Sequence, residues 1–119
     1  MVVDDEESIR GIFSAFLTRL GHEVAVAETG PLALAQLELS RPHLVLLDIW
    51  MPGMNGIEVL KKIKDLHPEM PVIMVTAEMD EEIGRSAVES GAADYLTKPI
   101  TLGRLNTHLT VHLIMESDE

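Results

Sequence analysis

The stretch that decides the fold of this 119-residue sequence is Leu44-Val45-Leu46-Leu47-Asp48-Ile49-Trp50-Met51-Pro52-Gly53. Its first four residues are all apolar, and a short apolar run without alternation is typical of a strand covered on both faces in a parallel sheet. The Pro52-Gly53 pair then predicts a turn. Asp48 therefore stands where a buried strand passes into a loop, and sites in open parallel sheets form at such strand ends.

The same kinds of segment alternate along the rest of the chain. Short apolar runs predict strands, and longer stretches with apolar residues every three or four positions predict helices. The predicted strands cover residues 1–4, 24–27, 44–47, 72–76 and 95–97, and the predicted helices cover 7–20, 30–40, 56–66, 80–90 and 101–115. Five successive β-α units predict an α/β fold with three layers, a doubly wound (βα)5 arrangement around a five-stranded parallel sheet.

The length, net charge and composition of the chain exclude several classes of protein. The length suits one domain, residues 1–119, and leaves no room for an output domain in this chain. A net charge of −11 argues against direct binding of nucleic acid or an anionic membrane. The absence of cysteine excludes disulfides and thiol chemistry. Neither a transmembrane span nor an export signal is evident, so we expect a cytoplasmic protein.

Carboxylates, a hydroxyl group and an ammonium group are predicted to meet at one edge of the sheet. They belong to Asp4 and Asp5 after the first strand, Asp48 after the third, Thr76 and Ala77 at the end of the fourth, and Lys98 after the fifth. Three neighbouring carboxylates repel one another unless a cation is bound. Oxygen ligands without Cys or His favour Mg²⁺, with Mn²⁺ as an alternative. A carboxylate beside such an ion can attack phosphorus, so this edge has the parts for phosphoryl transfer.

A second candidate cluster is weaker. His108 and His112 lie one turn apart in the last predicted helix, a spacing that can chelate a metal. The sequence shows no third ligand near them and contains no HExxH motif. We therefore interpret the pair as ordinary helix residues at this stage.

Five short motifs occur in order along almost the whole chain. They are Val2-Val3-Asp4-Asp5-Glu6, Leu46–Gly56, Val75-Thr76-Ala77, Gly91-Ala92-Ala93-Asp94-Tyr95 and Leu96-Thr97-Lys98-Pro99. Together they resemble the receiver domain of bacterial two-component response regulators, of the chemotaxis-receiver type. The resemblance implies a flavodoxin-like strand order, 2-1-3-4-5. It also implies a phosphorylation-activated switch that accepts its phosphoryl group from a histidine kinase or a histidine phosphotransfer protein.

The resemblance implies specific roles for the acidic residues. Asp48 is expected to be the phosphoacceptor and a ligand of Mg²⁺. Asp5 is expected to bind the ion directly and Asp4 mainly through water, and the backbone carbonyl of Trp50 is expected to complete the protein ligands.

Roles for the remaining motif residues follow from the same resemblance. Lys98 is expected to pair with Asp48 and then with the phosphoryl group, and the Lys98–Pro99 peptide bond is expected to be cis. Thr76 and Ala77 are expected to contact the phosphoryl oxygens, and Tyr95 to turn inward as Thr76 moves. The face made by helix 4, strand 5 and helix 5 would then change. It would act on an output domain or an effector protein, or pair with a second copy of the chain.

Two other functions fit part of the pattern. A degenerate receiver would bind a partner without accepting phosphate. A Mg²⁺-dependent phosphohydrolase would also use an aspartyl phosphate, but such enzymes commonly carry a second acid two residues after the nucleophile, where this chain has Trp50. Two local departures are the short first strand, with three residues before Asp4, and Gly103 early in the last helix, which costs about 1 kcal/mol relative to alanine.

Overall fold

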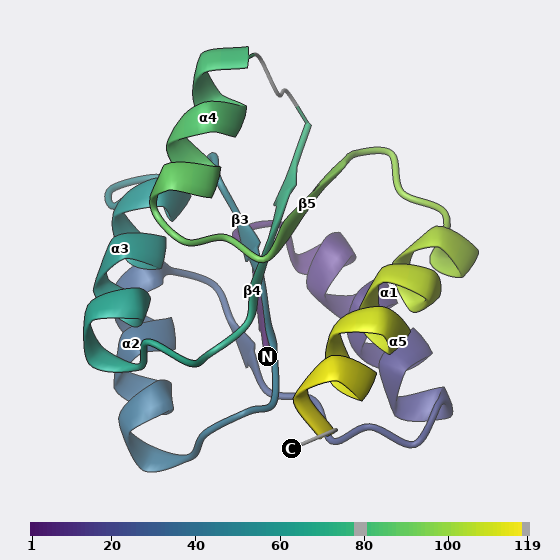
Figure 1. Cartoon of the computed structure of the whole chain (residues 1–119). Coiled ribbons are helices and arrows are strands. Elements are labelled where there is room, and N and C mark those ends of the chain that lie inside the picture. Colours follow the sequence, from purple (N-terminus) through teal and green to yellow (C-terminus); the bar gives the residue numbers. More distant parts are fainter. Residues whose placement is uncertain (78–80, 118–119) are drawn as a thin grey trace.

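The fold is a parallel sheet between two layers of helices (Figure 1). The computed structural model describes residues 1–77 and 81–117. The strands are β1 (Val2–Val3), β2 (Val26–Ala27), β3 (Val45–Asp48), β4 (Val72–Thr76) and β5 (Asp94–Thr97), and the helices are α1 (Glu7–Arg19), α2 (Gly30–Leu39), α3 (Gly56–Leu66), α4 (Glu81–Glu89) and α5 (Leu102–Ser117). The strands pair in the order β2-β1-β3-β4-β5, and every pair is parallel. The predicted fold class and strand order are confirmed.

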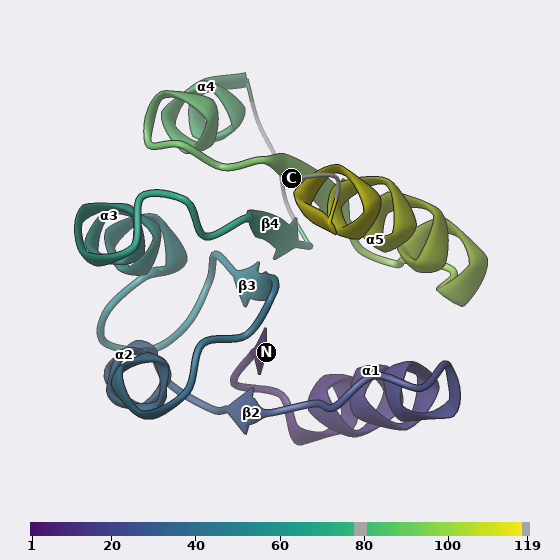
Figure 2. The ribbon, with the colours of Figure 1, turned by 60° about the horizontal axis from the view of Figure 1, so that its bottom comes forward.

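The sheet divides the core into two halves. Figure 2 shows α2, α3 and α4 on one side of the sheet and α1 and α5 on the other. Alternate residues of β3 contribute to different halves: Val45 and Leu47 pack with α2, α3 and α4, whereas Leu46 packs with α1 and α5. Both faces of β3 and β4 are buried, and this explains why their sequences carry apolar residues without alternation.

The predicted ranges of α3 and β4 agree with the structure, and most other element boundaries differ from the predicted ones by one or two residues. The second strand begins at Val26 rather than at residue 24, at the edge of the sheet, where Val26 is 40% exposed and has one neighbouring strand. The fifth strand begins one residue earlier than expected, because Asp94 pairs with Ile73 of β4. The fourth helix is described from Glu81 onward, and its predicted first residue, Asp80, lies outside the described residues.

The turn into α5 follows the sequence pattern. The Lys98–Pro99 peptide bond is cis, as expected. The Thr101 hydroxyl accepts a hydrogen bond from the backbone N–H of Arg104 at 3.2 Å and so caps the helix. In the part of the chain that the structure describes, no helix has both the length and the apolar character needed to cross a bilayer.

Two glycines give opposite predictions for stability. A Cβ added at Gly103 meets nothing within 4 Å, whereas one added at Gly56 would lie 2.2 Å from the backbone oxygen of Asp48. We expect Gly103→Ala to raise the free energy of unfolding by about 0.5 to 1 kcal/mol, because alanine loses less backbone entropy in a helix. We expect Gly56→Ala to lower it by more than about 1 kcal/mol. Urea unfolding of the two variants checks both signs, and a loss of stability in Gly103→Ala would contradict the packing described here.

Candidate functional site

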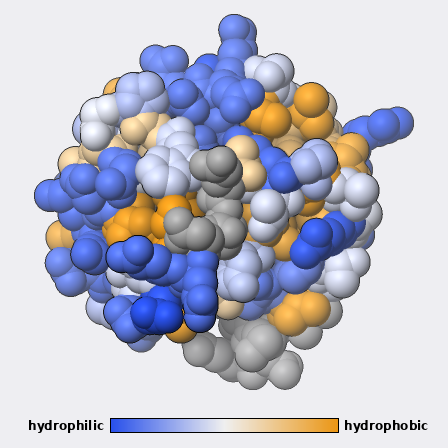
Figure 3. Space-filling model, turned by 90° about the horizontal axis from the view of Figure 1, so that it is seen from above, coloured by the Kyte–Doolittle hydropathy of each residue, from blue (hydrophilic) through white to orange (hydrophobic). Residues whose placement is uncertain are grey.

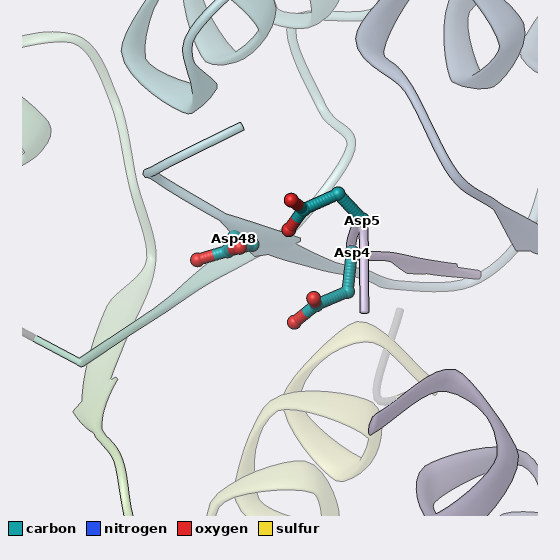
Figure 4. A group of neighbouring side chains, drawn as sticks. All are labelled: Asp4, Asp5 and Asp48. Atoms are coloured by element: carbon teal, nitrogen blue, oxygen red, sulfur yellow. The ribbon is translucent and has the colours of Figure 1, made fainter. Parts of the chain in front are cut away.

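The three predicted acids meet at the carboxyl edge of the sheet. Val3 of β1 pairs with Leu47 of β3, so the residues that follow them lie side by side. Carboxylate oxygens of Asp4, Asp5 and Asp48 come within 4.8 Å of one another (Figure 4). Asp4 is 3% and Asp48 is 4% exposed, while Asp5 lies at the surface. Two buried carboxylates and one exposed carboxylate therefore share a small space.

Lys98 supplies the positive charge among these acids. Its Nζ donates a hydrogen bond to Oδ2 of Asp4 at 3.0 Å and lies 3.9 Å from Oδ1 of Asp48 and 3.8 Å from Oε1 of Glu6. Burial alone would lower the pKa of Lys98, but the hydrogen bond to Asp4 and the charges of Asp48, Asp4 and Glu6 raise it above its ordinary value. The ammonium group is thus shared among three acids, with Asp4 as its closest partner rather than Asp48.

Asp48 has an unusual affinity for protons. Burial and then the charge of Asp4 raise the pKa of Asp48 from 3.8 to about 7, against the opposing effects of Lys98 and a hydrogen bond from the backbone of Trp50. A carboxylate with this environment is poorly compensated by the protein itself. A divalent cation would supply the missing positive charge.

The loop after β3 is held tightly against the strand. The backbone N–H of Gly56 donates to the carbonyl of Ile49 at 2.7 Å, and the side chain of Asn55 accepts from the N–H of Glu58 at 3.1 Å, which caps α3. Glycine is required at position 56 because a Cβ there would overlap the backbone of Asp48 and Ile49. The Asn-Gly turn read from the sequence therefore fixes the backbone that carries Asp48.

The other predicted residues surround the acids at different depths. Thr76, the last residue of β4, is fully buried, and its carbonyl accepts a hydrogen bond from the N–H of Lys98 at 2.7 Å. Ala77 is exposed at the same edge. Trp50 is 50% and Tyr95 is 44% exposed, so the Tyr95 side chain points outward in this structure. Viewed from above this edge, the surface is largely hydrophilic with separate hydrophobic areas (Figure 3).

The described chain also has a cavity far from the acids. It measures about 670 Å³, and its lining residues include Met1, Leu17, Leu44, Leu109 and Leu113. It lies at the amino end of β1, next to the N-terminal ammonium group, which donates to the carbonyl of Leu44 at 2.9 Å. None of the three acids lines this cavity, so it is separate from the acidic site.

Arg10 is a residue of the site that we did not predict. Its guanidinium group donates to the backbone carbonyl of Asp4 at 2.6 Å and lies 4.0 Å from the carboxylate of Glu28. It thereby ties α1 to the ends of β1 and β2. One feature of the sequence could have pointed to Arg10: it is the only basic residue among the first eighteen, and it follows closely after the acidic residues at the end of β1.

The two candidate histidines of α5 meet an acid that the sequence did not point to. Oδ2 of Asp94 lies 2.5 Å from Nδ1 of His108 and 3.2 Å from Nε2 of His112. Burial alone would raise the pKa of Asp94, but hydrogen bonds from His108, the backbone of Tyr95 and His112 lower it below its ordinary value. This cluster lies at the opposite end of β5 from Lys98.

Comparisons with known proteins agree with this geometry. The family described as the response regulator receiver domain matches residues 1–110. The DNA-binding transcriptional regulator NtrC of Klebsiella pneumoniae is 43% identical over 101 residues, which cover 85% of this chain and 22% of NtrC. The alkaline phosphatase synthesis transcriptional regulatory protein PhoP of Bacillus subtilis is 39% identical over 110 residues, covering 92% of this chain and 45% of PhoP. The chain thus spans less than half the length of these relatives.

Solved structures agree in fold. A CheY-like response regulator receiver domain protein from Methanospirillum hungatei superposes with a TM-score of 0.95 at 32% identity, covering 98% of this chain and 94% of the other. The receiver domain of NtrX from Brucella abortus gives a TM-score of 0.89 at 38% identity, with 94% and 95% coverage.

The family match and the relatives, together with the acidic cluster at the carboxyl edge of the sheet, identify a phosphorylation-activated signalling domain. The chain belongs to the response regulator receiver domain family of two-component systems. Receiver domains generally bind Mg²⁺ through acidic residues and interact with kinases and output domains.

The raised pKa of Asp48 predicts how the metal-free protein responds to pH. Between about pH 4 and about pH 7 the folded protein holds a proton on Asp48 that the unfolded chain releases, so its stability falls as the pH rises through this window. Asp48→Asn removes this titration and should exceed the wild type in stability above about pH 7, by on the order of 2 to 4 kcal/mol. Urea unfolding in EDTA across the window measures the difference between the two proteins.

The matched control is Asp65→Asn, which removes an exposed carboxylate on α3. The lowered pKa of the N-terminal amine, about 6, acts with the opposite sign but is common to all three proteins. If the stability difference between the wild type and Asp48→Asn stayed constant with pH, the raised pKa of Asp48 would be wrong.

Proposed function

We propose that this chain is an active receiver, which takes a phosphoryl group onto Asp48 in a reaction that requires Mg²⁺. The observation that carries the proposal is the convergence of Asp4, Asp5 and Asp48 on one ammonium group, that of Lys98, at the carboxyl edge of the sheet. A degenerate receiver has no need for this costly grouping of like charges. It is the arrangement expected where a cation and a phosphoryl group are to be accommodated together.

The donor set fits Mg²⁺. The ligand atoms are carboxylate oxygens, which a hard divalent ion prefers, and no histidine belongs to the cluster. Asp5, Asp48 and the carbonyl of Trp50 would hold the ion, with Asp4 acting mainly through water. When bound, the ion would neutralise negative charge on Asp48 and on the phosphoryl oxygens. Mn²⁺ has the same ligand preference and is an alternative.

The proposed transfer is a displacement at phosphorus. An oxygen of the Asp48 carboxylate forms the new P–O bond as the bond from phosphorus to the donor breaks, and the electron pair of that bond leaves with the donor. Lys98, the Thr76 hydroxyl and the backbone N–H of Ala77 share the equatorial oxygens of the phosphoryl group. Lys98 already lies 3.9 Å from Asp48, so a small movement away from Asp4 brings it to that position.

The proposed output is a shift between two conformations. A phosphoryl group adds about two negative charges and strong hydrogen-bond acceptors beside Asp48. These attract Thr76 and Lys98, and the outward Tyr95 side chain turns inward as Thr76 moves. The face formed by α4, β5 and α5 changes accordingly and signals to an output domain, an effector protein or a second copy of the chain.

The partners follow from the chemistry of the site. The phosphoryl donor is a histidine kinase or a histidine phosphotransfer protein in the cytoplasm. Residues 1–119 act as one receiver domain, and any action on DNA belongs to a separate output domain or effector, because the net charge of −11 opposes direct contact with nucleic acid.

The test is intact-mass spectrometry after incubation with acetyl phosphate, with and without Mg²⁺. We expect the wild type to gain the mass of one phosphoryl group when Mg²⁺ is present, and we expect the added group to be labile at alkaline pH. Asp48→Asn should gain nothing, and the control Asp65→Asn should behave as the wild type.

The other two functions give different results in the same experiment. A phosphohydrolase would release phosphate through many cycles from a range of phosphate monoesters. A degenerate receiver would gain no mass from acetyl phosphate or from a phosphorylated histidine phosphotransfer protein. Phosphorylation of Asp48→Asn to the wild-type extent would refute the assignment of the acceptor.

A further inference from the structure

A set of candidate metal ligands lies outside the acidic site. Asp94 begins β5, and His108 and His112 lie one turn apart on α5. The three side chains are partly exposed, at 26%, 31% and 19%, respectively. They connect a strand to a helix that is joined to it by a short turn, and they take no part in the proposed phosphoryl transfer.

The Asp94 carboxylate is held in a fixed orientation. Its Oδ1 accepts a hydrogen bond from the backbone N–H of Tyr95 at 2.8 Å, which leaves Oδ2 directed at the two imidazole rings. An ionised carboxylate can only accept hydrogen bonds, so each ring must present an N–H to Oδ2. Two ring protons therefore point at one oxygen atom.

The Asp94 carboxylate oxygen lies within reach of both imidazole rings, as one ligand of a metal lies beside two others. Zinc binds imidazole nitrogen and carboxylate oxygen at about 2.0 to 2.2 Å, which places neighbouring ligand atoms of a tetrahedral site about 3.3 Å apart. Oδ2 of Asp94 lies 2.5 Å from Nδ1 of His108 and 3.2 Å from Nε2 of His112. The two ring nitrogens do not lie within 4.8 Å of each other. The imidazoles must therefore rotate toward each other, about the soft torsion that carries each ring, before they can share one ion.

We propose that Asp94, His108 and His112 form a binding site for a late first-row divalent metal ion, with Zn²⁺ as the representative ion. Two imidazoles and one carboxylate are a ligand set that such ions prefer over Mg²⁺. On binding, each ring nitrogen that faces Oδ2 gives up its N–H and offers a lone pair to the ion: a neutral ring moves that proton to its other nitrogen, and a protonated ring releases one proton to solvent. The partial exposure of all three side chains leaves a path for entry and room for water as a further ligand.

The site is distinct from the acidic cluster in chemistry as well as in place. The Asp4, Asp5 and Asp48 cluster offers oxygen ligands to a hard ion, whereas this cluster offers two nitrogens. A bound ion would cross-link β5 to α5 next to Tyr95. It would therefore stabilise the α5 helix against the sheet without involving Asp48.

The experiment is calorimetric titration of the untagged full chain with Zn²⁺ in the presence of excess Mg²⁺, which competes for the oxygen ligands of the acidic cluster. We expect one equivalent to bind, and we expect His108→Gln, His112→Gln and Asp94→Asn each to weaken binding by at least about ten-fold. The matched control is the double variant His22→Gln/His43→Gln, which removes two exposed histidines elsewhere, and should bind as the wild type does.

A second measurement does not depend on how the variants fold. In NMR spectra of the wild type, Zn²⁺ should shift the ring signals of His108 and His112 together and leave those of His22 and His43 in place. The absence of one-equivalent binding would overturn the proposal. So would unchanged affinity in both α5 histidine variants, or shifts confined to the other histidines; the cluster would then be only a hydrogen-bonded link between β5 and α5.

Discussion

An imbalance of charge at the carboxyl edge governs the arrangement of the residues around it. Three carboxylates meet one ammonium group, and the two buried carboxylates, those of Asp4 and Asp48, cannot be relieved by water. Lys98 lies between these acids and compensates part of their charge, while the protonation of Asp48 compensates a further part. Any species that brings positive charge to this edge is favoured for the same reason, and the protein without such a species is under electrostatic stress.

Much of the fold could be predicted because it depends on local composition. A strand covered on both faces is apolar at nearly every position, so β3 and β4 can be recognised in the sequence. Five successive β-α units then leave few possible topologies. The positions of Asp4, Asp5 and Asp48 follow from their places at strand ends. The order of the strands could not be predicted from the residues of any one strand. Its prediction came from the resemblance to receiver domains.

What could not be predicted involves the choice among several partners far apart in the chain. Lys98 has three acids within reach, and the lengths and packing of side chains decide that Asp4 is its closest partner. The importance of Arg10 and of Asp94 could not be predicted for the same reason. Each is an ordinary charged residue in the sequence, and its importance comes from neighbours brought to it by the sheet and by α5.

The close contact at Gly56 gives the site two unlike sides. On one side the start of α3 lies against the backbone of Asp48 with no space for even a methyl group, and a hydrogen bond between Gly56 and Ile49 fixes it there. On the other side lie Thr76, at the end of β4, and the exposed Ala77. Because the contact at Gly56 leaves no free space, the backbone of Asp48 cannot move toward α3, and any displacement at Asp48 must be directed away from that helix. Gly56 therefore makes α3 the stationary part of the site, against which movements of the other elements around Asp48 take place.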